Sequence, residues 1–179
     1  MYYNNFNMLC RQNWSTKSEQ ALNQQITYEY CASISYHMLS NYFARDDIGL
    51  EKLREYYAKA SLEEREHADK LMAYQNMRGG VVCLGDVKET PFVLSSPTEN
   101  DIVSSFKFAL ELEKTINQHL LDLHGVADSE SDPQFADYLE GEFLKEQVEA
   151  ISEISKIISV LERFNGDQHA IWNYVQTTL

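Results

Sequence analysis

The chain has 179 residues, with 28 acidic against 15 basic side chains and a formal net charge of -13. This length favours one domain with a sizeable core, and the presence of only seven glycines and three prolines favours an all-α protein. Because phosphate contacts need clustered lysine and arginine, the charge argues against nucleic acid as a partner. Cations are the favoured partners, although an acidic surface can also serve solubility alone.

The start of the chain has neither the basic nor the apolar region of a signal peptide, and no stretch approaches the roughly 18 apolar residues of a membrane span. The three cysteines, Cys10, Cys31 and Cys83, are odd in number and scattered, which fits reduced thiols. We therefore expect a cytoplasmic protein that does not enter a membrane. Residues 1–15 are expected to be an N-terminal extension, and residues 16–179 one domain.

The first half of the chain predicts two long helices and a crossover. Thr16 and Glu19 have the spacing of a capping box, and helical periodicity follows over residues 22–44. A second helix is predicted over residues 50–78, where Gly79 and Gly80 end it. Residues 81–95 hold no helical period and are too long for a tight turn, so they are predicted to cross over along a bundle.

The second half predicts two more long helices and a short one. Ser96, Pro97 and Glu99 form a capping box with proline at the first helical position, and the helix is predicted to end near His124. Asp132 and Pro133 repeat the signal for a fourth helix to about residue 164, and residues 168–178 predict a fifth. This order is typical of a ferritin-like four-helix bundle with one long crossover and a short C-terminal helix.

Each long helix carries an apolar stripe that a polar residue interrupts near the middle. The interruptions are Glu29, Glu64 with His67, Glu113 and Gln147. Antiparallel packing would bring them to a similar depth in the core. Burial of an unpaired carboxylate costs several kcal/mol, and three of them rival a net stability of about 5 to 15 kcal/mol. The pattern therefore predicts a positive charge among these side chains.

A di-metal site meets this requirement, because bundle cores bind two metals with glutamates and Glu-x-x-His motifs. Glu64 and His67 form such a motif, which alone is more often solvated than ligating but here lies on an apolar stripe. Carboxylate oxygens with one imidazole favour iron or manganese, and zinc can also bind. The fourth helix has Gln147 and Ala150 in place of a second motif, so one metal should bind more weakly.

At these residues the chain closely resembles the animal ferritin heavy-type subunit over residues 11–179. The matching stretches are residues 11–13, 63–68, 70–72, 75–80, 112–114 and 146–148. The resemblance implies that Glu29, Glu64, His67 and Glu113 bind iron at a ferroxidase centre, with Tyr36 and Gln147 as its hydrogen-bonding neighbours. It also implies that the chain oxidises Fe(II) with dioxygen and stores a ferric oxyhydroxide mineral in a shell of 24 subunits, of one or several types.

The resemblance implies two further groups of iron-binding residues. The first group lies at the channel on the three-fold axis: Asp137 and Glu140 line it, and His124 lies at its outer approach. The second group is a mineral nucleation cluster on the inner surface, formed by Glu63, Glu66 and Asp69. For both groups a solvated acidic helix face is the alternative. The chain departs from the family in a longer crossover and in a polar fifth helix, which places His169, Asn173 and Thr177 toward the four-fold axis.

Two other classes of protein share this bundle. A structural or iron-carrying shell subunit would have the same helices but would oxidise nothing. A di-iron oxygenase or a rubrerythrin-like peroxidase would hold its metals as a permanent cofactor. The missing second Glu-x-x-His motif argues against the oxygenase, and the absence of any Cys-x-x-Cys pair argues against the peroxidase.

Overall fold

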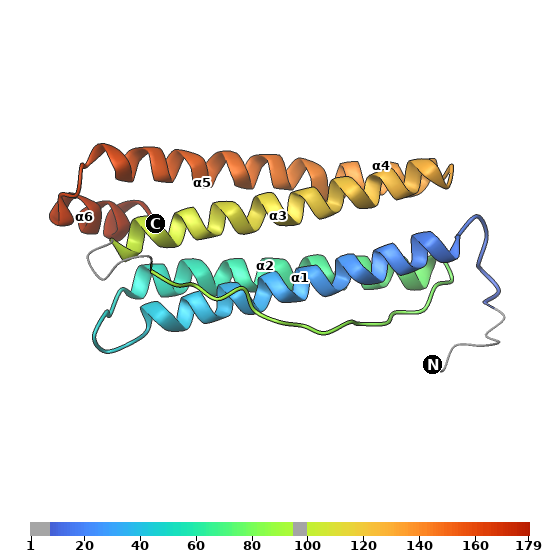
Figure 1. Cartoon of the computed structure of the whole chain (residues 1–179), viewed down its shortest axis with the longest axis horizontal. Coiled ribbons are helices and arrows are strands. Elements are labelled where there is room, and N and C mark those ends of the chain that lie inside the picture. The colour runs from blue at the N-terminus through green and yellow to red at the C-terminus, as the bar shows by residue number, and fades with distance from the viewer. Residues whose placement is uncertain (1–7, 95–99) are drawn as a thin grey trace.

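The computed structural model describes residues 8–94 and 100–179. Within these ranges the chain is helical and contains no strand, and its elements are α1 (Thr16–Phe43), α2 (Glu51–Met77), α3 (Asp101–Ser129), α4 (Pro133–Leu139), the π-helix η1 (Glu140–Leu144), α5 (Lys145–Arg163) and α6 (Gln168–Thr178). The segments α4, η1 and α5 form one rod, and with α1, α2 and α3 they make a four-helix bundle (Figure 1). The predicted fold class is confirmed.

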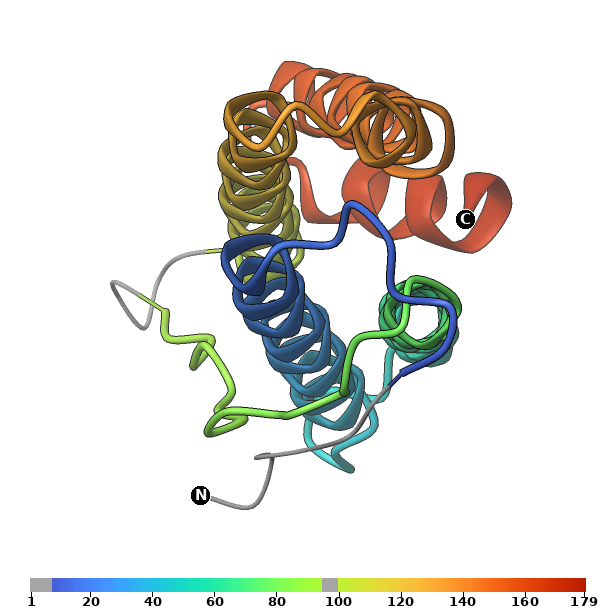
Figure 2. The same ribbon diagram turned by 90° about the vertical axis from the view of Figure 1, so that its right-hand side faces the viewer.

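The four rods occupy the corners of the bundle when it is viewed from one end (Figure 2). The short α6 lies across the end at which α5 finishes, and it buries Ile171 and Val175 there. None of the helices in the described ranges combines the length and the apolarity needed to cross a lipid bilayer.

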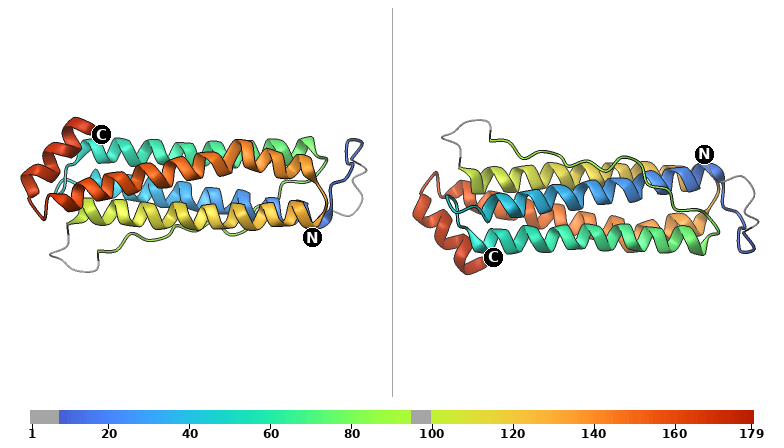
Figure 3. Two further views of the ribbon diagram at one scale, coloured as in Figure 1. Left: turned by 90° about the horizontal axis from the view of Figure 1, so that it is seen from above. Right: turned by 90° about the horizontal axis from the view of Figure 1, so that it is seen from below.

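The predicted crossover runs along the outside of α1 for much of the bundle's length (Figure 3). Four side chains of α1, spaced four residues apart, accept hydrogen bonds from backbone N–H groups of the crossover. The accepting side chains are Asn23, Thr27, Cys31 and Ser35. Because residues four apart share one face of a helix, a single polar stripe on α1 positions this extended segment.

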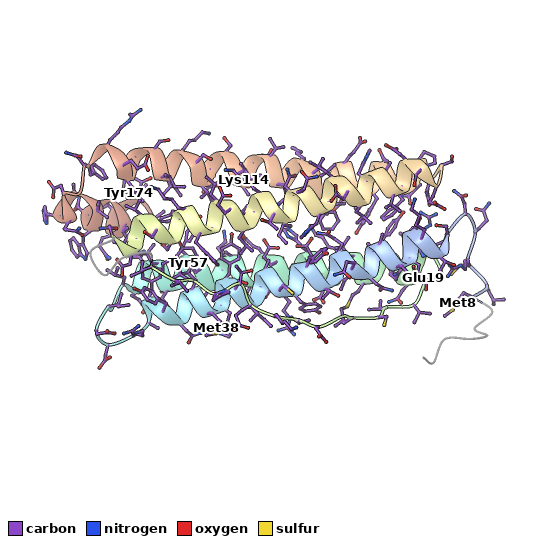
Figure 4. The ribbon with its side chains drawn as sticks, viewed as in Figure 1. Met8, Glu19, Met38, Tyr57, Lys114 and Tyr174 are labelled. Atoms are coloured by element: carbon purple, nitrogen blue, oxygen red, sulfur yellow. The ribbon has the colours of Figure 1, made fainter. Side chains whose placement is uncertain are left out.

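Aromatic side chains fill the core on one side of the layer that contains Glu29 and Glu64. Tyr57 is fully buried between the helices (Figure 4) and stacks on Tyr36 at 6.1 Å and on Phe43 at 5.7 Å between ring centroids. Burial of one large apolar side chain contributes about 1.5 to 3 kcal/mol. These contacts join α1 to α2, so they hold in register the two helices that carry the first three predicted ligands.

Two predicted helix boundaries are wrong in detail. The N-cap of α1 is Ser15, whose hydroxyl accepts from the backbone N–H of Ser18, whereas Glu19 accepts from the backbone of Val81 in the crossover. Helix α3 continues through Gly125 to Ser129, because the chain leaves the helix only where Ser131 takes a positive φ of 54°. The predicted capping box at residues 96–99 lies outside the described residues.

The fourth helix is not one regular α-helix, as the sequence had predicted, because the π-helical turn η1 interrupts it. The buried residues Leu139, Phe143 and Gln147 lie four positions apart, before, within and after this turn. In a regular α-helix each such step would rotate the side chain by about 40° away from the core. A π-turn has more residues per turn, so it removes this drift and returns Gln147 to the centre of the bundle.

Candidate metal centre

The first part of the site joins α1 and α2. Glu29, Glu64 and His67 each offer a ligand atom, and these atoms lie within 4.8 Å of one another. Glu29 is 0% exposed and Glu64 is 4% exposed. The spacing of three between Glu64 and His67 places both on one face of α2, and His67 Nδ1 lies 3.5 Å from Glu64 Oε2. The structure thus brings together three of the predicted ligands.

The second part of the site centres on Glu113 of α3, which is buried. The hydroxyl of Tyr36 on α1 donates to Glu113 Oε1 at 2.5 Å. The amide of Gln147 on α5 donates to Glu113 Oε2 at 3.0 Å. Both carboxylate oxygens of Glu113 are therefore oriented by hydrogen bonds from Tyr36 and Gln147 on neighbouring helices.

The site strongly disfavours unbalanced negative charge. Burial, and then the charge of Glu64, raise the pKa of Glu29 well above its usual range. Burial, and then the charge of Glu113, raise the pKa of Glu64 to about 8. Burial and the charge of Glu113 also raise the pKa of Tyr36, so its phenol stays protonated and donates. Without a cation these carboxyl groups hold protons that they would lose in water.

Two oxygen atoms at the centre of this cluster have no hydrogen-bond partner among the described residues. They are Glu29 Oε2 and Glu64 Oε2, and both are buried. The amide of Gln25 donates to the other oxygen of Glu29 at 2.8 Å, which leaves Oε2 free to face Glu64 and His67. Buried polar atoms are normally satisfied, and a divalent cation bound by oxygen and imidazole would satisfy both oxygens at once. The residues fit iron.

Two cavities lead from the site to the surface between α2 and α5. The larger, of about 340 Å³, is lined by Glu64, His67, Glu113 and Gln147 and by the side chains Ala60, Glu63, Glu66, Lys70, Glu146 and Ala150. The smaller, of about 180 Å³, also reaches Glu113, beside Tyr36 and Glu63. The site is therefore buried but accessible to ions from one face of the bundle.

Comparison with known proteins agrees with this geometry, because residues 19–164 match the ferritin-like domain of the ferritin family. The chain belongs to the ferritin family. Its relatives include chloroplastic ferritins of Malus baccata var. xiaojinensis, 45% identical over 96% of this chain and 68% of the relative, and of Phaseolus vulgaris, 44% identical over 96% and 67%. Ferritin-1 of Nicotiana tabacum, also chloroplastic, is 44% identical over 96% and 68%.

These relatives correct two expectations. The sequence had suggested an animal heavy-type subunit, but the relatives found are plant ferritins, so the family is confirmed and the animal type is not. The relatives carry chloroplastic names, which overturns the expectation of a cytoplasmic protein. That expectation rested on the composition of the first residues and on the scattered cysteines, neither of which reports a plastid location.

The residues that the resemblance assigned to the inner surface lie on different sides of α2. Glu63 and Glu66 line the larger cavity, and Glu63 also pairs with Lys59 at 3.2 Å. Asp69 instead faces α1, where Tyr30 donates to it at 3.4 Å. Glu63, Glu66 and Asp69 are spaced by three residues, and three residues fall about 60° short of a full helical turn. The side chain of Asp69 therefore points away from the cavity. Glu63 and Glu66, but not Asp69, therefore line the cavity at the candidate metal centre.

The residues expected at the channels lie at the two ends of the bundle. His124 Nε2 lies 2.8 Å from Glu140 Oε1, and Asp137 is exposed on α4 one turn earlier. On α6 the three polar residues are exposed: His169, Asn173 and Thr177. The contact between His124 and Glu140 joins α3 to the start of the π-turn, so these two expected channel residues are linked within one chain.

The raised pKa values predict an unusual pH dependence for the metal-free protein. A carboxyl group with a raised folded-state pKa binds more protons in the native than in the unfolded state, so the free energy of unfolding falls as the pH rises through that window. For Glu64 the window extends from its ordinary pKa to about 8. We expect the melting temperature of the chelated protein to fall between about pH 5 and pH 8.

Glu64→Gln provides the control for this pH dependence, because the amide is uncharged at every pH in this range. The variant should show a smaller fall in melting temperature than the wild-type protein over the same range. Added Zn²⁺ should also reduce the fall in the wild type. Parallel melting curves for the two proteins would contradict the expected role of Glu64.

Proposed function

We propose that this chain oxidises Fe(II) with dioxygen at the centre formed by Glu29, Glu64, His67 and Glu113, and stores the iron as a ferric oxyhydroxide mineral within a shell of 24 subunits. The observation that carries the proposal is the convergence of unsatisfied buried carboxylate oxygens with an imidazole nitrogen. A bundle that only shaped a shell would be more stable with apolar residues at these positions.

The geometry supports a distinct role for each residue. Glu29 and His67, which cluster with Glu64, would hold one Fe(II), and Glu113, which lines the same cavity as Glu64 and His67, would hold the second. Glu64 would serve both ions, because it clusters with Glu29 and His67 and lines the same cavity as Glu113. Each Fe(II) gives one electron to dioxygen, and the carboxylates stabilise the higher charge that results. Gln147 adds no charge, so the second ion is held more weakly and moves on to storage.

Assembly into a shell is supported by the family and by exposed apolar residues on the face shared by α1 and α2. Ile34, Met38 and Leu62 are 37%, 54% and 60% exposed, and Met38 is labelled on the outer side of α1 in Figure 4. Exposed apolar side chains gathered on one face are typical of surfaces that other subunits cover. The plastid names of the relatives support storage of plastid iron.

The proposal is tested by loading the metal-free protein with Fe(II) in air. We expect a very large assembly by light scattering and a soluble ferric mineral inside it by electron microscopy. A large shell that binds iron but consumes no oxygen would instead identify a subunit that carries iron without oxidising it. A stable monomer that leaves the ferric product to precipitate would contradict both functions.

Iron uptake into the shell should depend on the carboxylates near the three-fold axis. We expect Asp137→Ala combined with Glu140→Ala to slow mineral formation severalfold, because acidic side chains at a narrow opening raise the local cation concentration. Assembly should remain intact, since both side chains are exposed. Glu130→Ala, which removes a partly exposed carboxylate pairing with Lys17, is a control. Uptake at the wild-type rate in the double variant would place the iron path elsewhere.

A further inference from the structure

Glu146 of α5 makes a contact with His67 that the sequence pattern did not suggest. Its Oε2 atom lies 3.1 Å from His67 Nε2, the ring nitrogen that faces away from Glu64. The other ring nitrogen, Nδ1, faces Glu64 Oε2 at 3.5 Å. Glu146 also lines the larger cavity, next to Gln147 in the chain. The imidazole therefore lies between two carboxylates that face different nitrogens.

The two contacts determine which nitrogen of a neutral His67 carries the hydrogen. A carboxylate only accepts hydrogen bonds, so the contact with Glu146 requires the hydrogen on Nε2. Nδ1 then presents its lone pair toward Glu29 and Glu64. Glu64 Oε2 has no hydrogen-bond partner among the described residues, so no hydrogen bond from Nδ1 competes with this tautomer. The lone pair and the carboxylate oxygens then face the same point.

We propose that Glu146 is a positioning residue for the metal centre, which holds His67 in the Nε2–H tautomer and turns Nδ1 toward the iron. This inference rests on the proposed function, because it assumes that His67 is an iron ligand. Histidines that bind metals commonly donate their second N–H to a carboxylate, and loss of that partner typically lowers metal affinity by about 10- to 100-fold. Glu146 need not touch the iron to have this effect.

The surroundings of Glu146 support a fixed position for its carboxylate. Lys70 Nζ lies 3.8 Å from Glu146 Oε1, the carboxylate oxygen that His67 does not contact. Lys70 also lies 5.9 Å from the ring centroid of Phe143, and His67 packs edge-on against the same ring at 5.7 Å. Phe143 is buried within the π-turn. This turn thus sets the phase of α5 so that Glu146 reaches His67 while Gln147 reaches Glu113.

The test separates hydrogen bonding from charge with three variants of the assembled, metal-free protein. Glu146→Ala removes both the acceptor and the charge, whereas Glu146→Gln removes the charge but keeps a carbonyl that can accept from Nε2–H. Glu142→Ala is the matched control, because Glu142 is 51% exposed against 49% for Glu146 and also lies 3.8 Å from Lys70. Co²⁺ is the probe, read by calorimetry and by its visible absorption.

We expect Glu146→Ala to weaken Co²⁺ binding at the centre by at least about tenfold and to change the absorption bands as His67→Ala does. Glu146→Gln should stay close to Glu142→Ala in affinity and should keep the wild-type bands. Equal losses in Glu146→Ala and Glu146→Gln would overturn the positioning role in favour of charge or direct ligation. If His67→Ala bound Co²⁺ like the wild-type protein, both this proposal and the proposed iron site would be overturned. If Glu146→Ala kept the wild-type Co²⁺ bands and oxidised iron normally, only the positioning role would be overturned.

Discussion

Replacing Glu64 and His67 together with alanine is expected to abolish the fast phase of Fe(II) oxidation. The double variant removes the carboxylate between the two proposed iron positions and the imidazole nitrogen of the ligand cluster. Because loss of outer partners alone costs about 10- to 100-fold in affinity or activity, loss of two ligands should cost more than about 100-fold. Stopped-flow absorbance after mixing the metal-free protein with Fe(II) in air measures this phase.

The double variant should still fold, because it removes a buried carboxyl group that burial and the charge of Glu113 make unfavourable. Circular dichroism and light scattering would verify the helices and the assembly. Glu55→Ala serves as the control, since it removes an exposed glutamate from the same helix at a distance from the cavity. An undiminished fast phase in the double variant, with its helices and assembly intact, would show that oxidation takes place at another site.

The convergence of the candidate ligands could be predicted from the sequence because the bundle core has a strong periodic signal. An ionisable residue on an apolar stripe is costly unless it is paired, so Glu29, Glu64 and Glu113 stood out without any structural knowledge. Their position at mid-helix predicted that antiparallel helices would bring them together. The structure confirms this convergence for Glu29, Glu64 and His67, and it adds Glu113 through Tyr36 and Gln147.

Other features lacked such a signal. Glu146 is half exposed and precedes Gln147, so its position indicates an ordinary solvated residue; only the packing of α5 against α2 shows its contact with His67. The π-turn depends on how the whole rod fits the core, and no single residue between Glu140 and Leu144 requires it. Ser15 and Thr16 are both good N-cap residues, and the extended backbone of Ser15 decides between them.

Substitution of Asp132 is expected to cause a large loss of stability at the end of the bundle. Its carboxylate is 2% exposed, accepts from Arg78 Nη2 at 2.6 Å, and caps α4 by accepting from the backbone N–H of Phe135. Arg78 in turn lies 4.6 Å from the ring centroid of Trp14 and donates to the carbonyl oxygen of Asn13. The pair of Arg78 and Asp132 thus connects the end of α2, the start of α4 and the segment before α1.

Asp132→Ala should lower the free energy of unfolding by about 3 to 5 kcal/mol, because it leaves a largely buried guanidinium without its carboxylate partner. Asp132→Asn should cost less, since the amide oxygen can still accept from the backbone N–H of Phe135 and so retain the cap. Guanidinium unfolding at equal protein concentrations, followed by circular dichroism, would measure both values. If the two variants lost equal stability, the capping hydrogen bond would contribute nothing measurable. If neither lost more than about 1 kcal/mol, as for an exposed ion pair, the contact between Arg78 and Asp132 would not hold the fourth helix in place.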